Sequence, residues 1–388
     1  MYKRILELNL PEYQSAFLWG ARKTGKSTFL KDSFSKSYYI DLLRSDLYLK
    51  YSKEPWLFRE ELLTLGKNVY RYPIIVDEVQ KIPILLDEVH YLIENKKLQF
   101  ILCGSSARKL KRGSANLLGG RAWGYHFFPL VYPEITDFNL LKILNQGLLP
   151  MHYLSSDYNK SLMAYVHDYL SEEIQAEGIV RNLPQFARFL DSVGFSNGEL
   201  MNFSNIARDC GVSSVTVKEY YQILVDTLLG YFIYPSTNKK GRDTISSVPK
   251  FYFFDVGVAN YLGKKTIQDL RGESAGKAFE NYILMELMAY KTLKDKNYDI
   301  KFWRTKTGLD VDFVIEEKNT IIEVKISKIV RKEDLKGTIA FLSEKPNTKA
   351  YVVSLDSSPR KLTVKDGLEI MVLPYKRFLE DLWKGKII

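Results

Sequence analysis

The stretch SAFLWGARKTGKSTFL, Ser15 to Leu30, decides the fold of the first part of this chain. It reads as a short apolar strand, a loop with two glycines and the start of a helix. The loop fits the pattern GxxxxGK[ST] at every position. Backbone N–H groups of such a loop wrap phosphate oxygens, and the helix behind it points its positive end at them. The stretch therefore predicts an ATP-binding P-loop at the first turn of a mostly parallel α/β sheet.

Two side chains of this loop have specific roles in that prediction. The ammonium of Lys26 is expected to reach the β- and γ-phosphates, and the Ser27 hydroxyl to ligate Mg²⁺. The residues predicted to hold the nucleotide are Gly20, Ala21, Arg22, Lys23, Thr24, Gly25, Lys26, Ser27 and Thr28.

The second half of a P-loop site is an apolar strand that ends in an acidic residue, and YPIIVDEVQ, Tyr72 to Gln80, fits it. Asp77 takes the role of a magnesium ligand, and Glu78 that of the base that orients and deprotonates the attacking water. The pair favours hydrolysis over phosphoryl transfer to a metabolite. The alternative is that both carboxylates cap the following helix, where negative charge is stabilised.

Two further side chains are candidates for sensing or stabilising the γ-phosphate. Ser105 ends the strand LQFILCGSS; it either lies between the two halves of the site or caps the next helix. Arg121 stands before a predicted strand and Arg108 follows Ser105 closely. Of these we favour Arg121, which would act within its own chain or from a neighbouring subunit of a homo-oligomer.

At this point the sequence resembles a known family. The series GARKTGKST, PIIVDEVQKIP, ILCGSSARKL and LLGGRAWGYHFFPLVYPEI is similar to a large prokaryotic family of AAA+-type ATPases, whose C-terminal region resembles a PD-(D/E)xK nuclease. The resemblance runs over nearly the whole chain. It implies ATP binding and hydrolysis, with Lys26, Ser27, Asp77 and Glu78 in their usual roles.

The middle of the chain, residues 151–271, predicts a helical lid followed by a winged helix. Apolar residues recur at helical spacing through SLMAYVHDYLSEEI and LPQFARFLDSV, and FSNIARDCGVSSVTVKEYYQILVD reads as a helix-turn-helix. A hairpin around the basic loop NKKGRD would be the wing. The side chains that we expect to contact DNA are Ser214, Thr216, Lys218, Glu219, Lys239, Lys240 and Arg242. The alternative is a packing module whose charges are merely solvated.

The last part, residues 272–388, predicts a restriction-endonuclease-like α/β domain with the element order α-β-β-β-α-β. Two of its strands are LDVDFVIEE and TIIEVKIS. Side chains two apart on a strand share a face, so pairing of these strands would bring Asp312 close to Glu323 and Lys325. Two adjacent carboxylates suit a divalent metal, and the lysine would stabilise developing charge.

The resemblance adds one residue to that site, because Glu280 matches the accessory acid of similar nucleases. If the cluster holds a metal, the Val324 carbonyl would complete the metal's shell and Arg304 could steer a phosphate. Asp310 stands where the family more often shows Glu. The alternative is an ion-pair cluster in a domain that keeps the fold without the activity.

The composition of the chain indicates the kind of partner and the compartment to expect. The chain has 388 residues, a formal net charge of +10 and a pI near 9.1, which suits a polyanionic partner such as DNA. No apolar run is long enough to cross a bilayer and no signal peptide is recognisable, so we expect a cytoplasmic protein. We assign residues 1–150 to the ATPase domain. Taken together, the three parts predict an ATP-regulated DNA-processing enzyme. The alternative is a nucleotide-dependent switch with an inactive nuclease-fold domain.

Overall fold

The computed structural model describes residues 2–106, 118–170, 182–236, 248–364 and 367–388. The chain forms two compact units. The first comprises residues 1–130 and 223–229, and the second comprises residues 131–222 and 230–388. Among the described residues, none of the helices combines the length and the apolarity needed to cross a bilayer.

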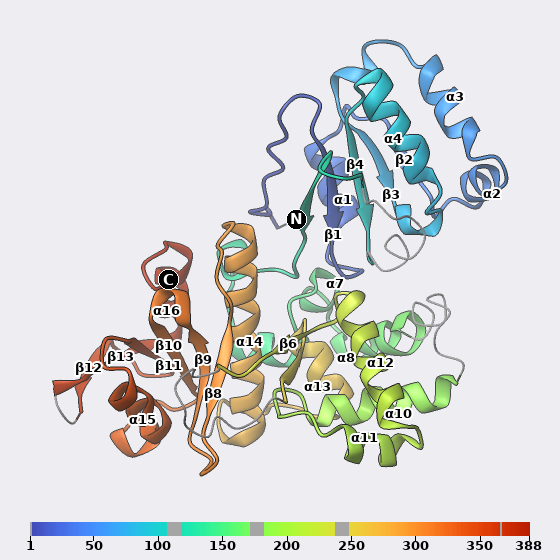
Figure 1. Cartoon of the computed structure of the whole chain (residues 1–388). Coiled ribbons are helices and arrows are strands. Elements are labelled where there is room, and N and C mark those ends of the chain that lie inside the picture. Colours follow the sequence, from blue (N-terminus) through green and yellow to red (C-terminus); the bar gives the residue numbers. More distant parts are fainter. Residues whose placement is uncertain (1, 107–117, 171–181, 237–247, 365–366) are drawn as a thin grey trace. The chain divides into compact units, whose positions relative to one another are not determined.

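The first unit is built on a five-stranded sheet in the order β2-β3-β4-β1-β5 (Figure 1). Each neighbouring pair of strands is parallel, as the sequence predicted. The strands are β1 Ser15–Trp19, β2 Tyr39–Asp41, β3 Ile74–Asp77, β4 Phe100–Gly104 and β5 Ala122–His126. Strand β4 lies between β1, which precedes the glycine loop, and β3, which ends at Asp77. The carboxyl ends of these three strands therefore meet at one edge of the sheet.

Alternation along the buried strands gives this sheet two cores. In β1, Ala16 and Leu18 face the side of α1, whereas Phe17 and Trp19 face the side of α3 and α4. The helices of this unit are α1 Lys26–Ser33, α2 Ser45–Lys53, α3 Trp56–Thr64 and α4 Leu85–Lys96. Because both faces are covered by apolar side chains, β1, β3 and β4 are buried along their whole length.

The second unit begins with helices and a short hairpin. Its helices are α6 Leu140–Gln146, α7 Pro150–Tyr153, α8 Tyr158–Ala164, α10 Leu183–Phe195, α11 Phe203–Cys210, α12 Ser214–Asp226, whose last residues group with the first unit, and α13 Val256–Leu262. Strands β6 Gly230–Ile233 and β7 Lys250–Phe253 pair antiparallel. The predicted helix-turn-helix and hairpin are thus present as elements, with Ser213 accepting from the N–H of Thr216 at the start of α12. The basic residues Lys239, Lys240 and Arg242 lie outside the described residues.

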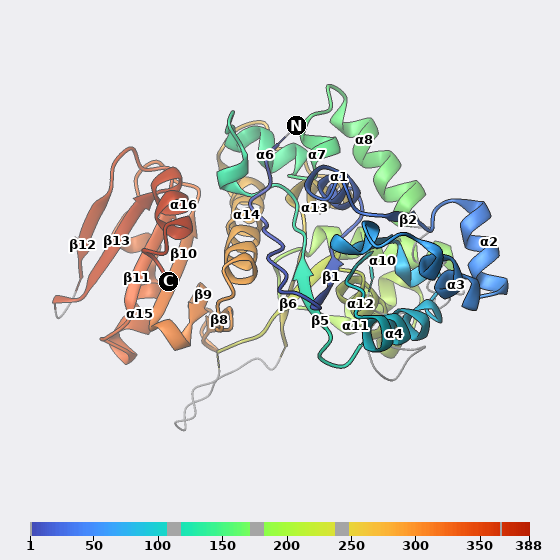
Figure 2. The ribbon, with the colours of Figure 1, turned by 90° about the horizontal axis from the view of Figure 1, so that it is seen from above.

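A six-stranded mixed sheet completes the second unit. Its order is β12-β13-β11-β10-β9-β8, which can be followed in Figure 2. The strands are β8 Lys301–Arg304, β9 Asp310–Ile315, β10 Thr320–Lys325, β11 Lys349–Ser354, β12 Arg360–Thr363 and β13 Glu369–Pro374. Helix α14 Gly272–Leu293 packs on β10 and α16 Tyr375–Trp383, while α15 Lys336–Glu344 packs on β9. The run α14-β8-β9-β10-α15-β11 has the predicted α-β-β-β-α-β order.

The compact units do not follow the three predicted domains. The segment from Val131 to residue 150, which we placed in the ATPase domain, groups with the second unit. The helical middle and the last third form one unit because α14 contacts α6 and α13 as well as the sheet. A helix shared by two layers joins them into one core, and sequence periodicity does not reveal that sharing.

Candidate functional site

The glycine loop follows β1 directly and ends at Gly25, the N-cap of α1. Gly25 has φ 97°, a left-handed conformation that glycine adopts without steric cost. The Lys26 side chain turns back over the loop and its Nζ donates to the carbonyls of Gly20 (2.6 Å) and Ala21 (3.0 Å). The Thr24 hydroxyl donates to the same Ala21 carbonyl (2.8 Å). The loop is thus closed on itself at the carboxyl edge of the sheet.

The two predicted magnesium ligands lie side by side. The Ser27 hydroxyl donates to Oδ2 of Asp77 at 2.6 Å, although fifty residues separate them in the chain. Tyr39, at the start of β2, donates to the same carboxylate oxygen at 2.5 Å. A hydroxyl and a carboxylate oxygen in contact are the protein ligands that Mg²⁺ takes beside a triphosphate, so these residues fit that metal. Tyr39 was not predicted, since a tyrosine on an apolar strand has no distinguishing pattern.

Glu78 stands next to Asp77 in an unusual backbone conformation. Its φ is 59° and its side chain is buried. A non-glycine residue in this region is strained, and such strain concentrates at functional sites. Burial raises the pKa of the Glu78 carboxyl, while the charges of Lys26 and Arg22 oppose the rise. The carboxylate predicted to act as a base therefore lies within the field of the phosphate-binding loop.

A buried hydrogen-bond chain connects Glu78 to the end of β4. Nε2 of Gln80 donates to Oε2 of Glu78 (2.5 Å) and to Oγ of Ser105 (3.0 Å). Gln80 has 4% of its surface exposed. The predicted sensor Ser105 thus lies between the two halves of the site, as one of its two interpretations required. Gln80 was missed because a glutamine two residues past an acidic pair carries no known spacing signal.

Arg121 lies at the other end of the sheet. Its carbonyl accepts from the N–H of Ser15, the first residue of β1, and its side chain pairs with Glu94 on α4. The glycine loop follows the last residue of β1, about 13 Å further along the strand. The prediction that Arg121 reaches the γ-phosphate within its own chain is therefore wrong; action from a neighbouring subunit stays a prediction. Arg108 lies outside the described residues.

Arg4 is a further residue at this site that we did not predict. Its guanidinium donates to the carbonyls of Thr24 (2.8 Å) and Phe128 (2.7 Å) and lies 4.1 Å from the ring centroid of Phe127. It ties the glycine loop to the segment after β5. A single arginine in a stretch without periodicity gives no signal in the sequence.

A second charged cluster lies in the second unit, where β9 and β10 meet. Asp312 and Glu323 are the next residues along β9 and β10 after the paired residues Phe313 and Ile322. Oδ2 of Asp312 accepts from the N–H of Val324 (2.8 Å), and Oε1 of Glu323 pairs with Nζ of Lys325 (2.6 Å). The predicted meeting of Asp312, Glu323 and Lys325 is thus seen. Burial and the charges of Glu323 and Glu280 hold the pKa of Asp312 well above its usual range.

The predicted accessory acid Glu280 has protein partners of its own. Its Oε1 accepts from Lys250 (3.3 Å) and from the hydroxyl of Tyr252, both on β7. Across the described ranges, no group of three or more His, Cys, Asp and Glu side chains is arranged to hold a metal. Glu280, Asp312 and Glu323 therefore do not fit the predicted metal site as they stand, because lysines occupy two of the three carboxylates.

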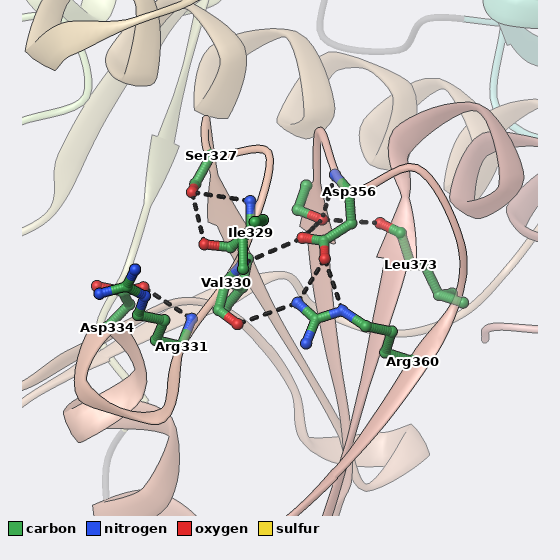
Figure 3. Close-up of polar contacts among 9 residues, drawn as sticks. Ser327, Ile329, Val330, Arg331, Asp334, Asp356, Arg360 and Leu373 are labelled. Carbon is green, nitrogen blue, oxygen red and sulfur yellow. Dashed lines mark hydrogen bonds and ion pairs between the residues drawn. The ribbon is translucent and has the colours of Figure 1, made fainter.

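The loop after β10 is fixed by a buried carboxylate (Figure 3). Asp356 accepts from the N–H of Val330 (3.2 Å), from Ser354 (2.9 Å) and from Nε of Arg360 (2.7 Å). Arg360 also donates to the Val330 carbonyl (3.0 Å). These hydrogen bonds tie Val330 to Asp356 and Arg360, so the network positions the segment that follows Lys325.

The helix-turn-helix presents part of its predicted DNA face to solvent. Ser214, Lys218 and Glu219 are exposed on α12, whereas Thr216 is half-buried. Elsewhere on α12, the apolar side chains of Val217, Tyr221 and Leu224 are buried. Arg304, predicted to steer a phosphate, lies 4.0 Å from Asp310.

Comparison with protein families identifies the first of these sites. Residues 12–136 match a family described as "AAA domain". This part of the chain is similar to AAA-type P-loop ATPase domains. Two further parts, residues 138–269 and 275–377, match families described as "Domain of unknown function", DUF8612 and DUF4143.

The individual relatives of this chain are distant. It is 23% identical over 252 residues to Uncharacterized protein Mb2031c of Mycobacterium bovis and, equally, to Uncharacterized protein Rv2008c of Mycobacterium tuberculosis. The matches cover 63% of this chain and 56% of each relative, so the chain spans about half the length of the curated relatives it matches. The Walker-type ATPase PABY2304 of Pyrococcus abyssi is similar with a TM-score of 0.41 and 14% identity, over 66% of this chain and 91% of that one.

Proposed function

We propose that the chain hydrolyses ATP and uses the nucleotide state to control its second unit on DNA. The observation that carries the proposal is the contact between Ser27 and Asp77, with Glu78 directly beside it. In phosphoryl transfer a protein contributes little covalent chemistry; it positions the phosphates and the attacking water and stabilises the negative charge on the phosphate oxygens. The glycine loop after β1 and the acidic end of β3 meet at the carboxyl edge of the first sheet.

Each side chain has a definite role in this proposal. Lys26 leaves the carbonyls of Gly20 and Ala21 to bind β- and γ-phosphate oxygens. Ser27 and Asp77 hold Mg²⁺, which when bound neutralises charge on the phosphates. Glu78 accepts a proton from the water whose oxygen attacks the γ-phosphorus, while the bond to the β-bridging oxygen breaks. The resulting ADP and phosphate are released.

Single substitutions test the hydrolytic part. Glu78→Gln should retain ATP binding and lower turnover by about a hundredfold or more, because general-base catalysis contributes that much. Lys26→Ala should lose binding as well. Lys53→Ala, an exposed lysine on α2, is the control and should change neither. Turnover by Lys26→Ala at the wild-type rate would refute the proposed site.

DNA is the proposed partner because the chain is basic and α12 exposes a face with Lys218 at its start. Binding through phosphates weakens with salt as counterions are released. Fluorescence anisotropy of labelled duplex DNA should show that dependence, and ATP and ADP should give different affinities. Identical affinities with the two nucleotides would exclude control of DNA binding by the nucleotide.

Metal-dependent cleavage of DNA is a rival candidate function for the second unit, and it requires a divalent metal to enter among carboxylates that Lys250 and Lys325 contact in this structure. It is favoured by the meeting of Asp312, Glu323 and Lys325 at the end of the β9–β10 pair. A nuclease assay on single-stranded, duplex and branched DNA, with and without ATP, tests it. Cleavage that is lost in Asp312→Ala while ATP turnover persists would establish it, and no cleavage with Mg²⁺ or Mn²⁺ would eliminate it.

A further inference from the structure

Lys250 brings a positive charge from the hairpin into the carboxylate cluster of the last sheet. It is the first residue of β7, in the middle part of the chain, and has 5% of its surface exposed. Its Nζ lies 3.3 Å from Oε1 of Glu280, and its charge also acts on Asp312 and Asp310. A lysine is almost never buried without a partner, so these carboxylates account for its position.

Tyr252 shows that the strand is built to hold Glu280. Residues two apart on a strand point to the same side, and both Lys250 and Tyr252 donate to the same oxygen, Oε1 of Glu280. Two donors from one rigid strand fix one carboxylate on α14. This is more than a surface ion pair, because Lys250 and Tyr252 are both buried.

The charges of the cluster nearly balance without any added ion. Four carboxylates, on Glu280, Asp310, Asp312 and Glu323, lie near three cationic groups, on Lys250, Arg304 and Lys325, which leaves a formal charge of −1 if every group is ionised. Each lysine sits on a different carboxylate. Carboxylates that lie together in a buried site are stabilised by a bound proton, by a divalent metal or by ammonium groups. Here the protein supplies the ammonium groups itself.

We propose that Lys250 is the built-in cation of this cluster, held against Glu280 and beside Asp312, and that it keeps the cluster from taking up a divalent metal. The cluster then joins β7 to α14 and β9 as a metal-independent ion-pair site. This cluster belongs to the second unit alone and does not depend on ATP hydrolysis by the first unit.

Removing the charge of Lys250 should expose the cluster to added metal. In Lys250→Met, a side chain of similar length without charge, Glu280 and Asp312 lose their cation. The variant should unfold at a lower temperature than the wild type, since half-buried Glu280 loses one of its two donors and buried Asp312 loses a neighbouring positive charge. Millimolar MnCl2 should then restore thermal stability, and affinity for Mn²⁺ should rise by about tenfold or more relative to the lysine protein. Lys250→Arg keeps the charge and should behave as the wild type.

The test uses the full chain with Asp77→Asn in every sample, so that the glycine loop does not contribute a metal site. Calorimetry with MnCl2 and thermal unfolding are measured for four proteins. Two retain Lys250, one of them with Asp312→Asn, and two carry Lys250→Met, one of them with Asp312→Asn. The protein that retains Lys250 should show no heat of Mn²⁺ binding at the cluster. Lys250→Met should show such heat, and adding Asp312→Asn to Lys250→Met should abolish it. Heat of Mn²⁺ binding in the Lys250 protein that disappears with Asp312→Asn overturns the proposal, and this comparison remains decisive even where Lys250→Met fails to fold. A folded Lys250→Met that binds no Mn²⁺ also overturns it.

Discussion

A buried glutamate in α14 should make the stability of the second unit fall with rising pH. Glu286 has 2% of its surface exposed; its two oxygens accept from the N–H of Tyr132 (2.9 Å) and from Nε1 of Trp383 (2.8 Å). Burial raises the pKa of Glu286 to about 8, although these donors lower it. The folded protein therefore keeps this proton in a range where the unfolded chain, with a pKa of 4.5, has lost it.

The sign and size follow from proton linkage. A carboxyl whose pKa is raised in the folded state contributes its full stability below pH 4.5 and loses it as the pH rises through about 8. With one pKa unit equal to 1.36 kcal/mol, the loss between pH 5 and 8 is about 3.5 kcal/mol. Glu286→Gln cannot titrate and should lack this loss, whatever its stability at any one pH.

The assay is denaturant unfolding between pH 5 and 8, followed by tryptophan fluorescence, since Trp383 contacts the titrating group. The difference in slope between wild type and Glu286→Gln isolates this carboxyl from the other groups that titrate in the same range. Glu344→Gln, on the exposed side of α15, is the control and should leave the slope unchanged. Parallel curves for wild type and Glu286→Gln would show that Glu286 is already ionised at neutral pH, and the reasoning from burial would fail.

Three further substitutions test other parts of the structure. Gln80→Ala should lower kcat of ATP hydrolysis about tenfold with little change in KM, because Glu78 loses the amide that orients it; an unchanged kcat would remove Gln80 from the site. Arg4→Ala should weaken ATP binding by about five- to tenfold in calorimetry, since the loop loses an anchoring hydrogen bond; equal affinity would show that the loop orders itself. Asp356→Ala should destabilise the chain by about 2 to 3 kcal/mol in denaturant unfolding, because Arg360 and its neighbours lose a buried acceptor. If Asp356→Ala lowers the free energy of unfolding by less than about 1 kcal/mol, the Asp356 network has no significant structural role.

Sequence alone determined the parts of this protein that depend on local pattern. The glycine loop, the strand that ends in Asp77 and Glu78, and the α-β-β-β-α-β order all follow from short-range spacing and periodicity. These patterns can be recognised in the sequence because a phosphate-binding loop and a buried strand each require particular residues at fixed spacings. The contacts between Ser27 and Asp77, and between Glu323 and Lys325, followed from them.

The tertiary structure decided which side chains from distant segments share a site. Gln80 reaches Ser105 because β4 lies between β1 and β3, and Arg121 misses the loop because it enters β5 at the opposite end of the sheet. Lys250 and Glu280 meet because β7 docks on α14. Nothing in the spacing of these residues encodes such meetings, since strand order and helix docking arise from burial of whole faces, which is a property of the packed chain and not of any one segment.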